Sequence, residues 1–313
     1  MSKIAITDYF DKINPEKEIL GELVGLGIGP ETEVLIVWHE KINDEFCKNL
    51  PNLRGVQRYG VGYDNLDLDY LKSRNIIACN NPDYGVDEVS DSAVAMIMNI
   101  SRGISNYNFQ AKSYFNNWQE NVNREIKRNS DTVVGIIGAG RIGGSVLMKC
   151  NALRYKTVFY DPYKERGYEK MIGSQRLDSL DELLAISDIV SIHTPLNDET
   201  AGIINKSFIK KMKVGSSLVN TARGGLIDHI DDLLDPLMTG HLNNVALDVI
   251  PNEPPRDEKL IELWRKSDPK IQGKIIINPH TSYFSQASIR ELRTNAAKNA
   301  LRIYKRETPF NLL

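Results

Sequence analysis

Residues 133–144 read VVGIIGAGRIGG, an apolar and largely β-branched run followed by a cluster of glycines. The run predicts a buried strand, and the residues from Arg141 onward predict a helix. The order G-x-G-x-x-G at such a junction is typical of a loop that binds the pyrophosphate of a dinucleotide. The first glycine allows a tight turn, the second lets phosphate approach the backbone, and the third lets helix and strand pack closely. We therefore expect a doubly wound α/β domain in which the helix N-terminus binds phosphate. The expected contacts are Gly138, Gly140, Arg141, Ile142 and Gly143.

A carboxylate follows the next predicted strand, residues 157–160. This residue, Asp161, is placed to accept hydrogen bonds from the adenosine ribose hydroxyls and to repel the additional phosphate of NADP. Pro162 and Tyr163, which come next, supply no cation for that phosphate. The sequence therefore predicts NAD rather than NADP. The alternative is a glycine-rich turn beside an unrelated surface aspartate.

Apolar runs alternate with stretches of helical spacing along the whole chain, which indicates parallel sheets with helices on both faces. A length of 313 residues suits two domains. Residues 88–102 and 285–304 predict long helices, and the polar stretch 106–130 predicts helical pieces and loops. Pro236 predicts a helix break near Leu234. The predicted strands are 3–7, 33–38, 54–58, 75–79, 132–137, 157–160, 188–192, 216–220, 245–249 and 274–277.

The composition excludes several classes of partner. The formal net charge is -2 and no basic stripe dominates, so we expect no nucleic-acid partner. The three cysteines show no metal-ligand spacing, so we expect no metal site and reduced thiols. The first residues lack the pattern of a signal peptide, and no apolar run approaches about 18 residues. We therefore expect a cytoplasmic protein that does not contact a membrane.

Three side chains that suit hydride transfer to a keto acid follow strands in the second half of the chain. Arg223 offers a planar fork for a carboxylate or a keto oxygen. His280 could exchange a proton near neutral pH, and a carboxylate such as Glu253 would keep it protonated and fix its tautomer. Taken singly, each has an ordinary alternative: an arginine in a surface turn, a capping or core histidine, and a loop acid.

Taken together, these stretches resemble the D-isomer-specific 2-hydroxyacid dehydrogenase family, and within it most closely the C-terminal-binding-protein branch. The resemblance covers roughly residues 54–305. Seven stretches of the chain, in this order, are similar to the family. They are RYGVGYDNLDL (58–68), NNPDYGVDEVSDSAV (80–94), GAGRIG (138–143), FYDPY (159–163), VNTARGGLID (219–228), ALDVIPNEPP (246–255) and NPHTSYFSQASI (278–289).

The resemblance implies two Rossmann-like, doubly wound parallel-sheet domains with the active site in the cleft between them. Residues 1–103 plus 285–313 would form a flavodoxin-like substrate-binding domain, and 104–284 the NAD-binding Rossmann domain. It implies a homodimer through the NAD domain. Arg223 would orient the substrate, His280 would be the acid/base and Glu253 its partner. The further cofactor contacts that it implies are Thr194, Pro195, Thr221, Ala222 and Asp248.

The resemblance and the residues themselves also predict substrate contacts in both domains. The loop of Gly60, Val61 and Gly62 would present backbone N–H groups to the substrate carboxylate. Arg58 would add to that contact or favour a second anionic group, although a solvated strand-end arginine is the alternative. Tyr84 and Tyr283 would line the pocket mouth, which suggests a mid-sized keto acid.

The sequence therefore predicts an NAD(H)-dependent oxidoreductase that interconverts a 2-keto acid and a D-2-hydroxy acid by hydride transfer. The alternative is an NAD(H)-sensing protein-interaction module of the corepressor kind with little turnover. The end of the chain close behind its last predicted helix favours the enzyme, because corepressors usually carry a disordered tail.

Overall fold

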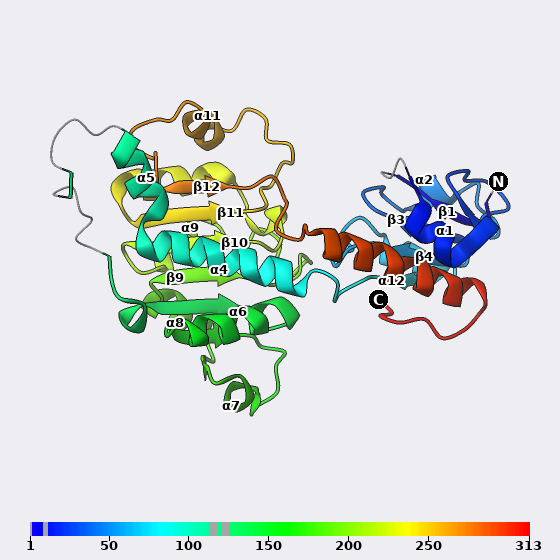
Figure 1. The fold of residues 1–313 in the computed structure, drawn as a ribbon, viewed down its shortest axis with the longest axis horizontal. Helices are drawn as coiled ribbons and strands as arrows, with labels where there is room; N and C mark the ends of the chain where they lie inside the picture. Colours follow the sequence, from blue (N-terminus) through cyan, green and yellow to red (C-terminus); the bar gives the residue numbers. More distant parts are fainter. Residues whose placement is uncertain (1, 9–11, 113–117, 120–125) are drawn as a thin grey trace. The chain divides into compact units, whose positions relative to one another are not determined.

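The computed structural model describes residues 2–8, 12–112, 118–119 and 126–313. The chain divides into two compact units, which we call the first unit (residues 1–85 and 284–313) and the second unit (86–283). The first unit contains both the blue N-terminal and the red C-terminal segments in Figure 1, so the second unit is inserted into it. Residues 113–117 and 120–125 of the predicted loops at 106–130 lie outside the described residues.

The first unit contains a five-stranded parallel sheet in the order β2-β1-β3-β4-β5. One face of the sheet contributes Leu35 and Val56 to an apolar cluster that also contains Leu71. The other face carries α12 and α1, which also pack against each other. The strands are β1 (Ile4–Ile6), β2 (Val24–Gly25), β3 (Val34–Val37), β4 (Gly55–Arg58) and β5 (Ile77–Cys79). The helices are α1 (Asn14–Leu20), α2 (Asp44–Cys47), α3 (Leu68–Ser73) and α12 (Gln286–Tyr304), with a 3-10 turn at Gly21–Leu23.

The second unit contains a seven-stranded parallel sheet in the order β12-β11-β10-β9-β6-β7-β8. The strand order reverses at β6 (Val133–Ile137), so β6 lies between β7 (Lys156–Tyr160) and β9 (Ile189–Ile192). Ligands of open α/β sheets bind beyond the carboxyl end of the strands at such a reversal. The other strands are β8 (Gln175–Arg176), β10 (Ser216–Asn220), β11 (Leu242–Leu247) and β12 (Ile275–Ile277).

Helices cover both faces of the second sheet, and successive strand residues enter different cores. Along β10, Leu218 joins one apolar cluster and Val219 the other. This alternation explains why the strands read as continuous apolar runs, since both faces are buried. The helices are α4 (Val86–Arg102), α5 (Ile104–Lys112), α6 (Arg141–Ala152), α7 (Tyr168–Ile172), α8 (Leu180–Ile186), α9 (Lys206–Lys211), α10 (Leu234–Thr239) and α11 (Lys259–Arg265). Short 3-10 turns occupy Asn129–Asp131, Gly224–Leu226 and Ile230–Leu233.

The division between the units differs from the boundary expected at residues 103–104. Helix α4 belongs to the second unit, because it packs against α6 and β10. Its buried residues Ala93, Met96 and Ile97 lie in the same apolar cluster as β6 and α6. The sequence of an amphipathic helix shows which of its faces is apolar. It does not show which of two sheets that face packs against, so the boundary at α4 could not be predicted.

All ten predicted strands are present, with small differences at their ends. Strands β2 and β8 were not predicted, because two-residue edge strands leave no apolar run. Strand β11 begins and ends earlier than expected, since the chain turns away at Asp248. The expected break near Leu234 is found where the 3-10 turn Ile230–Leu233 gives way to α10. Pro236 lies in the first turn of α10, where a backbone N–H is not needed.

Candidate active site

The glycine loop joins β6 to α6, and each of its three motif glycines has a distinct geometric role. A Cβ on Gly138, whose φ is +87°, would lie 2.9 Å from the His193 carbonyl carbon, and one on Gly143 would lie 1.9 Å from the Gly138 oxygen. These two glycines are therefore required for packing. A Cβ on Gly140, the N-cap of α6, would meet nothing within 4 Å. The second glycine thus leaves open space at the helix N-terminus, as phosphate binding requires.

Asp161 is held against this loop at the end of β7. Its Oδ2 accepts a hydrogen bond from the Ala139 N–H at 2.9 Å, and its Oδ1 accepts one from the Tyr163 N–H at 2.9 Å. The bond to Ala139 could not be predicted, because a backbone donor leaves no mark in residue identity.

Two unsatisfied hydroxyls lie among the predicted cofactor contacts. The Oγ1 atoms of Thr194 and Thr221 are buried without a hydrogen-bond partner in the described part of the chain. They follow β9 and β10, on the side of the sheet where the glycine loop follows β6. Pro195 is exposed, and Ala222 donates its N–H to Asn220 Oδ1 at 3.0 Å. Open space at the second glycine together with orphaned hydroxyls at neighbouring strand ends fits a bound dinucleotide.

His193, a histidine without ligand spacing in the sequence, lies behind the glycine loop. Its Nε2 shares a hydrogen bond with Ser191 Oγ at 2.9 Å. Burial lowers the pKa of His193 to about 3, so the ring is neutral at physiological pH. This residue therefore packs the loop and carries no charge there.

His280 and Glu253 form a direct pair. The Nδ1 atom of His280 lies 2.7 Å from Glu253 Oε2, and both side chains are partly exposed. Glu253 Oε1 accepts a hydrogen bond from the Ile250 N–H at 3.0 Å, which fixes the carboxylate. Because Nδ1 faces the carboxylate, Nε2 is the ring nitrogen left to exchange a proton.

The charges around Glu253 keep its carboxyl ionised. Burial acts to raise the pKa of Glu253, but the hydrogen bond and charge of His280 outweigh burial, together with the Ile250 N–H. The positive charge of Arg223 also lowers it, so the pKa of Glu253 lies below its usual value. A negative charge therefore stands beside His280 at all pH values where an ordinary glutamate is ionised.

Arg223 lies in a loop that Asn220 shapes at the end of β10. The Asn220 side chain donates to the Arg223 carbonyl at 2.9 Å, and Arg223 Nη1 donates to the Ala222 carbonyl at 2.7 Å. A Cβ on Gly224 would lie 1.9 Å from the Ile250 oxygen, so this loop packs closely against the loop that carries Glu253. The structure thus brings together residues that follow β10, β11 and β12, three neighbouring strands.

Asp248 braces the loop that carries His280, a role that the sequence did not predict. Its carboxylate accepts hydrogen bonds from the Thr281 N–H at 2.9 Å and the Ser282 N–H at 3.1 Å. The His280 N–H donates to the Asp248 carbonyl at 2.8 Å, and His280 has a left-handed φ of +55°. A non-glycine residue with positive φ needs such support. Tyr283 packs edge-on against the His280 ring at a centroid distance of 6.2 Å.

In the first unit, Arg58 lies beside the loop of Gly60, Val61 and Gly62. Its Nη1 would be 3.1 Å from a Cβ on Gly60, and its guanidinium lies 5.6 Å from the ring centre of Trp38. Two carbonyl groups of the loop accept hydrogen bonds from the segment that follows β5. Gly60 O accepts the Asn81 N–H at 3.1 Å, and Val61 O accepts the Asn80 side chain at 2.7 Å. Within the described residues, the loop N–H groups donate to no protein acceptor. Tyr84 is buried, with 8 % of its surface exposed.

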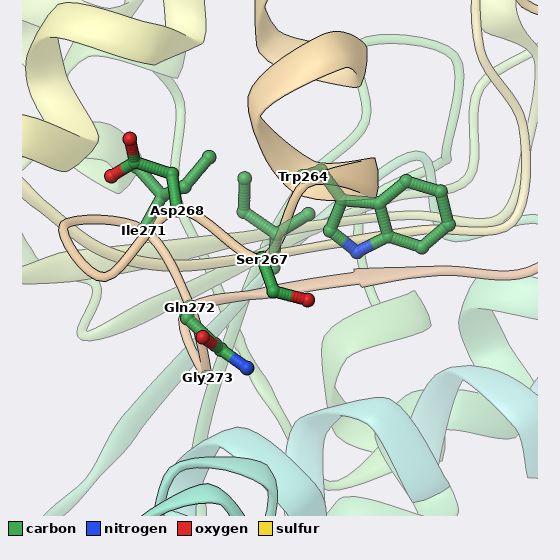
Figure 2. Close-up of a pocket in the computed structure, with 7 residues that line it drawn as sticks. Trp264, Ser267, Asp268, Ile271, Gln272 and Gly273 are labelled. Atoms are coloured by element: carbon green, nitrogen blue, oxygen red, sulfur yellow. The ribbon is translucent and has the colours of Figure 1, made fainter.

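One hollow of the second unit contains none of the predicted site residues. A cavity of about 140 Å³ lies between the end of α11 and β12, with Trp264 and Asp268 on its wall (Figure 2). Among the described residues, no group of three or more His, Cys, Asp or Glu is arranged to hold a metal ion. None of the described helices is long and apolar enough to cross a membrane.

Comparison with known proteins identifies the family. Residues 94–282 match the domain described as "D-isomer specific 2-hydroxyacid dehydrogenase, NAD binding domain". C-terminal-binding protein 1 of Caenorhabditis elegans is 32% identical over 292 residues, covering 90% of this chain and 38% of that protein. D-3-phosphoglycerate dehydrogenase of Bacillus subtilis (strain 168) is 34% identical over 257 residues, covering 82% of this chain and 46% of that protein. The chain therefore spans less than half the length of these curated relatives.

A solved structure agrees with these matches. D-lactate dehydrogenase from Aquifex aeolicus, crystallised with NAD and lactic acid, superposes with a TM-score of 0.83 and 27% sequence identity. The match covers 97% of this chain and 96% of that one, and therefore includes both parallel-sheet units. The chain belongs to the D-isomer-specific 2-hydroxyacid dehydrogenase family and carries its NAD-binding domain.

Proposed function

We propose that this protein is an NAD(H)-dependent oxidoreductase that interconverts a 2-keto acid and a D-2-hydroxy acid. The observation that carries the proposal is the 2.7 Å contact between His280 Nδ1 and Glu253 Oε2, with the Arg223 loop packed against the Glu253 loop. A cation, a proton donor and a carboxylate that stabilises that donor are the three groups that carbonyl reduction requires. The D configuration rests on the family alone.

NAD(H), when bound, supplies or accepts the hydride. The glycine loop with Arg141 and Ile142 would hold its pyrophosphate at the N-terminus of α6. Asp161 would bind the adenosine ribose. Thr221, Ala222 and Asp248 would contact the nicotinamide side, and Thr194 and Pro195 would line the cofactor cleft.

The protein side of the reaction is proton transfer and charge stabilisation. In reduction, His280 Nε2 would donate a proton to the keto oxygen of the substrate, and in oxidation it would take that proton from the hydroxyl. Glu253 stabilises the imidazolium before the transfer. Arg223 would bind the carboxylate and the keto oxygen, and so stabilise the negative charge that develops there.

The substrate class follows from the charges and rings near these groups. The N–H groups of Gly60, Val61 and Gly62 would bind the carboxylate, and Arg58 would strengthen that contact or bind a second anionic group. Tyr283, packed on His280, would contact the substrate tail. Tyr84 would line the pocket as well, although its burial leaves little surface for contact. These features support a mid-sized 2-keto acid.

The experiment that tests this function follows NADH absorbance with a panel of 2-keto acids. The panel contains glyoxylate, pyruvate, hydroxypyruvate, phenylpyruvate, 4-methylthio-2-oxobutyrate, phosphonopyruvate and 2-oxoglutarate. Turnover of one member that disappears in Arg223→Ala supports the proposal and names the substrate. Silence across the panel, with NADH still bound, argues against it.

A second candidate is an NAD(H)-sensing protein-interaction module. Its support is the 32% identity to C-terminal-binding protein 1 over 90% of this chain. It predicts that a partner peptide binds with different affinity to NADH-loaded and cofactor-free protein. The paired His280 and Glu253 favour the enzyme, because they supply the proton transfer that turnover needs.

Assembly and location are also proposals. We expect a homodimer through the NAD-binding domain, as the family resemblance implies, and light scattering of the purified protein tests this. All three cysteines are unpaired and buried, which supports a reducing compartment such as the cytoplasm.

A further inference from the structure

Helix α12 carries two polar side chains with little exposed surface, Arg293 and Asn299, that the proposed chemistry does not use. Arg293 pairs with Glu16 of α1: its Nε donates to Oε1 at 2.7 Å and its Nη2 to Oε2 at 2.5 Å. Glu16 is 0 % exposed and the Arg293 side chain 11 %. Asn299 is buried as well and donates to Gln57 Oε1 at 2.6 Å. Buried charges and amides are expensive unless they are fully paired, so a specific arrangement holds them here.

Hydrogen bonds connect both side chains to strand β4 or to Tyr59, the residue that follows it. Successive side chains of a strand point to opposite faces, so Gln57 and Tyr59 share one face and Arg58 the other. A Cβ on Gly55 would lie 2.3 Å from Ile303 Cγ2, which shows that this first face meets α12 (Figure 1). The absence of a side chain at Gly55 therefore lets the helix lie close to the strand.

Tyr59 connects the ion pair to the strand end. Its hydroxyl donates to Glu16 Oε1 at 2.9 Å, the same oxygen that Arg293 contacts. Burial, and next the charge of Glu16, raise the pKa of Tyr59, so its phenol remains a donor. Tyr59 immediately precedes Gly60, the first residue of the predicted substrate loop.

Gln57 is fixed from both sides. Its Nε2 donates to the Arg58 carbonyl at 2.7 Å, while its Oε1 accepts from Asn299. Asn299 also accepts the Phe310 N–H at 2.8 Å and donates to the Phe310 carbonyl at 3.0 Å. Of the two neighbours of Arg58 along the chain, Gln57 is thus bonded to α12 directly and Tyr59 through Glu16. The Arg58 side chain lies on the opposite face of the sheet.

We propose that Glu16, Gln57, Tyr59, Arg293 and Asn299 form a positioning network, the α12 brace, that sets Arg58 and the loop 60–62 for the anionic group of the substrate. The inference rests on the proposed function for the identity of that substrate. The brace residues do not touch the substrate. They hold the strand end from which the substrate contacts project.

The opposite end of the same strand offers a matched control. Arg54, just before β4, donates from Nη2 to the Tyr304 carbonyl of α12 at 2.5 Å and lies 2.6 Å from Glu33 Oε2. Arg54→Gln therefore removes a polar tie near the end of α12 without touching the loop end of β4. If the ties merely stabilise the first unit, Arg54→Gln and the brace variants should behave alike.

The test compares Tyr59→Phe and Asn299→Ala with Arg54→Gln in the full-length protein. Loss of a buried hydrogen bond at the brace should raise the KM for the keto acid about tenfold, with kcat and NADH affinity near wild type. Arg54→Gln should leave KM unchanged. Hydrogen exchange gives a readout without turnover, because the Asn81 N–H donates to the Gly60 carbonyl and the Tyr59 N–H to the Val37 carbonyl. Exchange at these two amides should accelerate in the brace variants only.

Each outcome is decisive. Wild-type KM in both brace variants, or an equal rise in KM in Arg54→Gln, would overturn the proposal. Faster exchange without a rise in KM would also overturn it. If the wild-type protein turns over no keto acid, the proposed function fails, and the exchange comparison alone then decides whether the brace sets the loop. Because Asn299→Ala and Tyr59→Phe cut different ties, a folding defect in one leaves the other to decide.

Discussion

Glu253 Oε2 lies 2.7 Å from His280 Nδ1, and the same carboxylate is fixed through its other oxygen by the backbone of Ile250. The pair is therefore oriented before any ligand binds. An imidazolium held by a fixed anion is a ready proton donor, and its second nitrogen remains available for the substrate.

The first prediction concerns this pair. His280→Ala should lower kcat for keto-acid reduction on the order of 100-fold or more, while NADH still binds. Glu253→Gln removes the negative charge that lies 2.7 Å from His280 Nδ1, so kcat should fall on the order of tenfold. Initial rates at saturating NADH and keto acid measure both effects. Glu258→Gln, the same change on a residue bonded to Asn252, is the control and should leave kcat unchanged. A wild-type kcat in Glu253→Gln would refute the assignment.

The second prediction separates two glycines of one loop. Gly143→Ala places a Cβ 1.9 Å from the Gly138 oxygen and should destabilise the protein by about 1–3 kcal/mol. Gly140→Ala meets nothing within 4 Å and should change stability by less than about 1 kcal/mol. It should nevertheless weaken NADH binding, because its methyl group enters the space left for phosphate. Thermal unfolding and a fluorescence titration with NADH measure the two effects. Normal NADH affinity in Gly140→Ala would show that the phosphates bind elsewhere.

The sequence was sufficient for the sheet and for the side chains that follow its strands. Strand β6 and its glycine loop could be predicted because the signal is local, with an apolar run and glycines at fixed spacing. Arg223, Glu253 and His280 could be predicted because parallel strands present their carboxyl ends on one edge. Their distances could not, since they depend on close approaches such as Gly224 to Ile250.

The contacts that hold the site residues in place could not be predicted from the sequence, and the reason is physical. Asp248 accepts hydrogen bonds from backbone N–H groups at Thr281 and Ser282, and backbone donors leave no trace in residue identity. Glu16 and Arg293 form an ion pair although they are 277 residues apart in the sequence. In the sequence, each is an ordinary charged residue of a predicted helix. Side chains that bind ligands can be recognised in a sequence by their residue type. Side chains that hold those residues in place can be recognised only from the contacts in the folded structure.

The third prediction concerns the choice of cofactor. Asp161→Asn removes the negative charge but keeps an oxygen to accept the Ala139 N–H. It should shift the NADH-to-NADPH preference toward NADPH by at least about tenfold, since the repulsion of the additional phosphate is lost. Asp161→Ala should produce the same shift and weaken NADH binding further, because the loop loses its acceptor. The ratio of kcat/KM values for the two cofactors checks both. An unaltered ratio in Asp161→Asn would mean that another group excludes NADPH.

The fourth prediction links a partly buried carboxylate, Asp188, to acid stability. Asp188 accepts hydrogen bonds from Lys213 Nζ at 2.7 Å, Lys127 Nζ at 2.9 Å and the Val133 N–H at 2.9 Å. Burial acts to raise the pKa of Asp188, but these donors outweigh it, so the pKa lies below the usual value. The folded protein then binds fewer protons than the unfolded chain between the two pKa values. The stabilisation is therefore complete above the ordinary pKa and is lost as pH falls through the folded one.

Asp188→Asn should accordingly lower the free energy of unfolding by about 1–3 kcal/mol at neutral pH. The difference from wild type should narrow below about pH 4, where Asp188 of the unfolded chain takes up a proton that the folded protein does not yet bind. Urea unfolding over a pH series measures it. Asp181→Asn, which removes an exposed pair with Lys211, is the control and should cost no more than about 1 kcal/mol. A gap between Asp188→Asn and wild type that stays constant into acid would show that Asp188 acts through packing rather than through its charge.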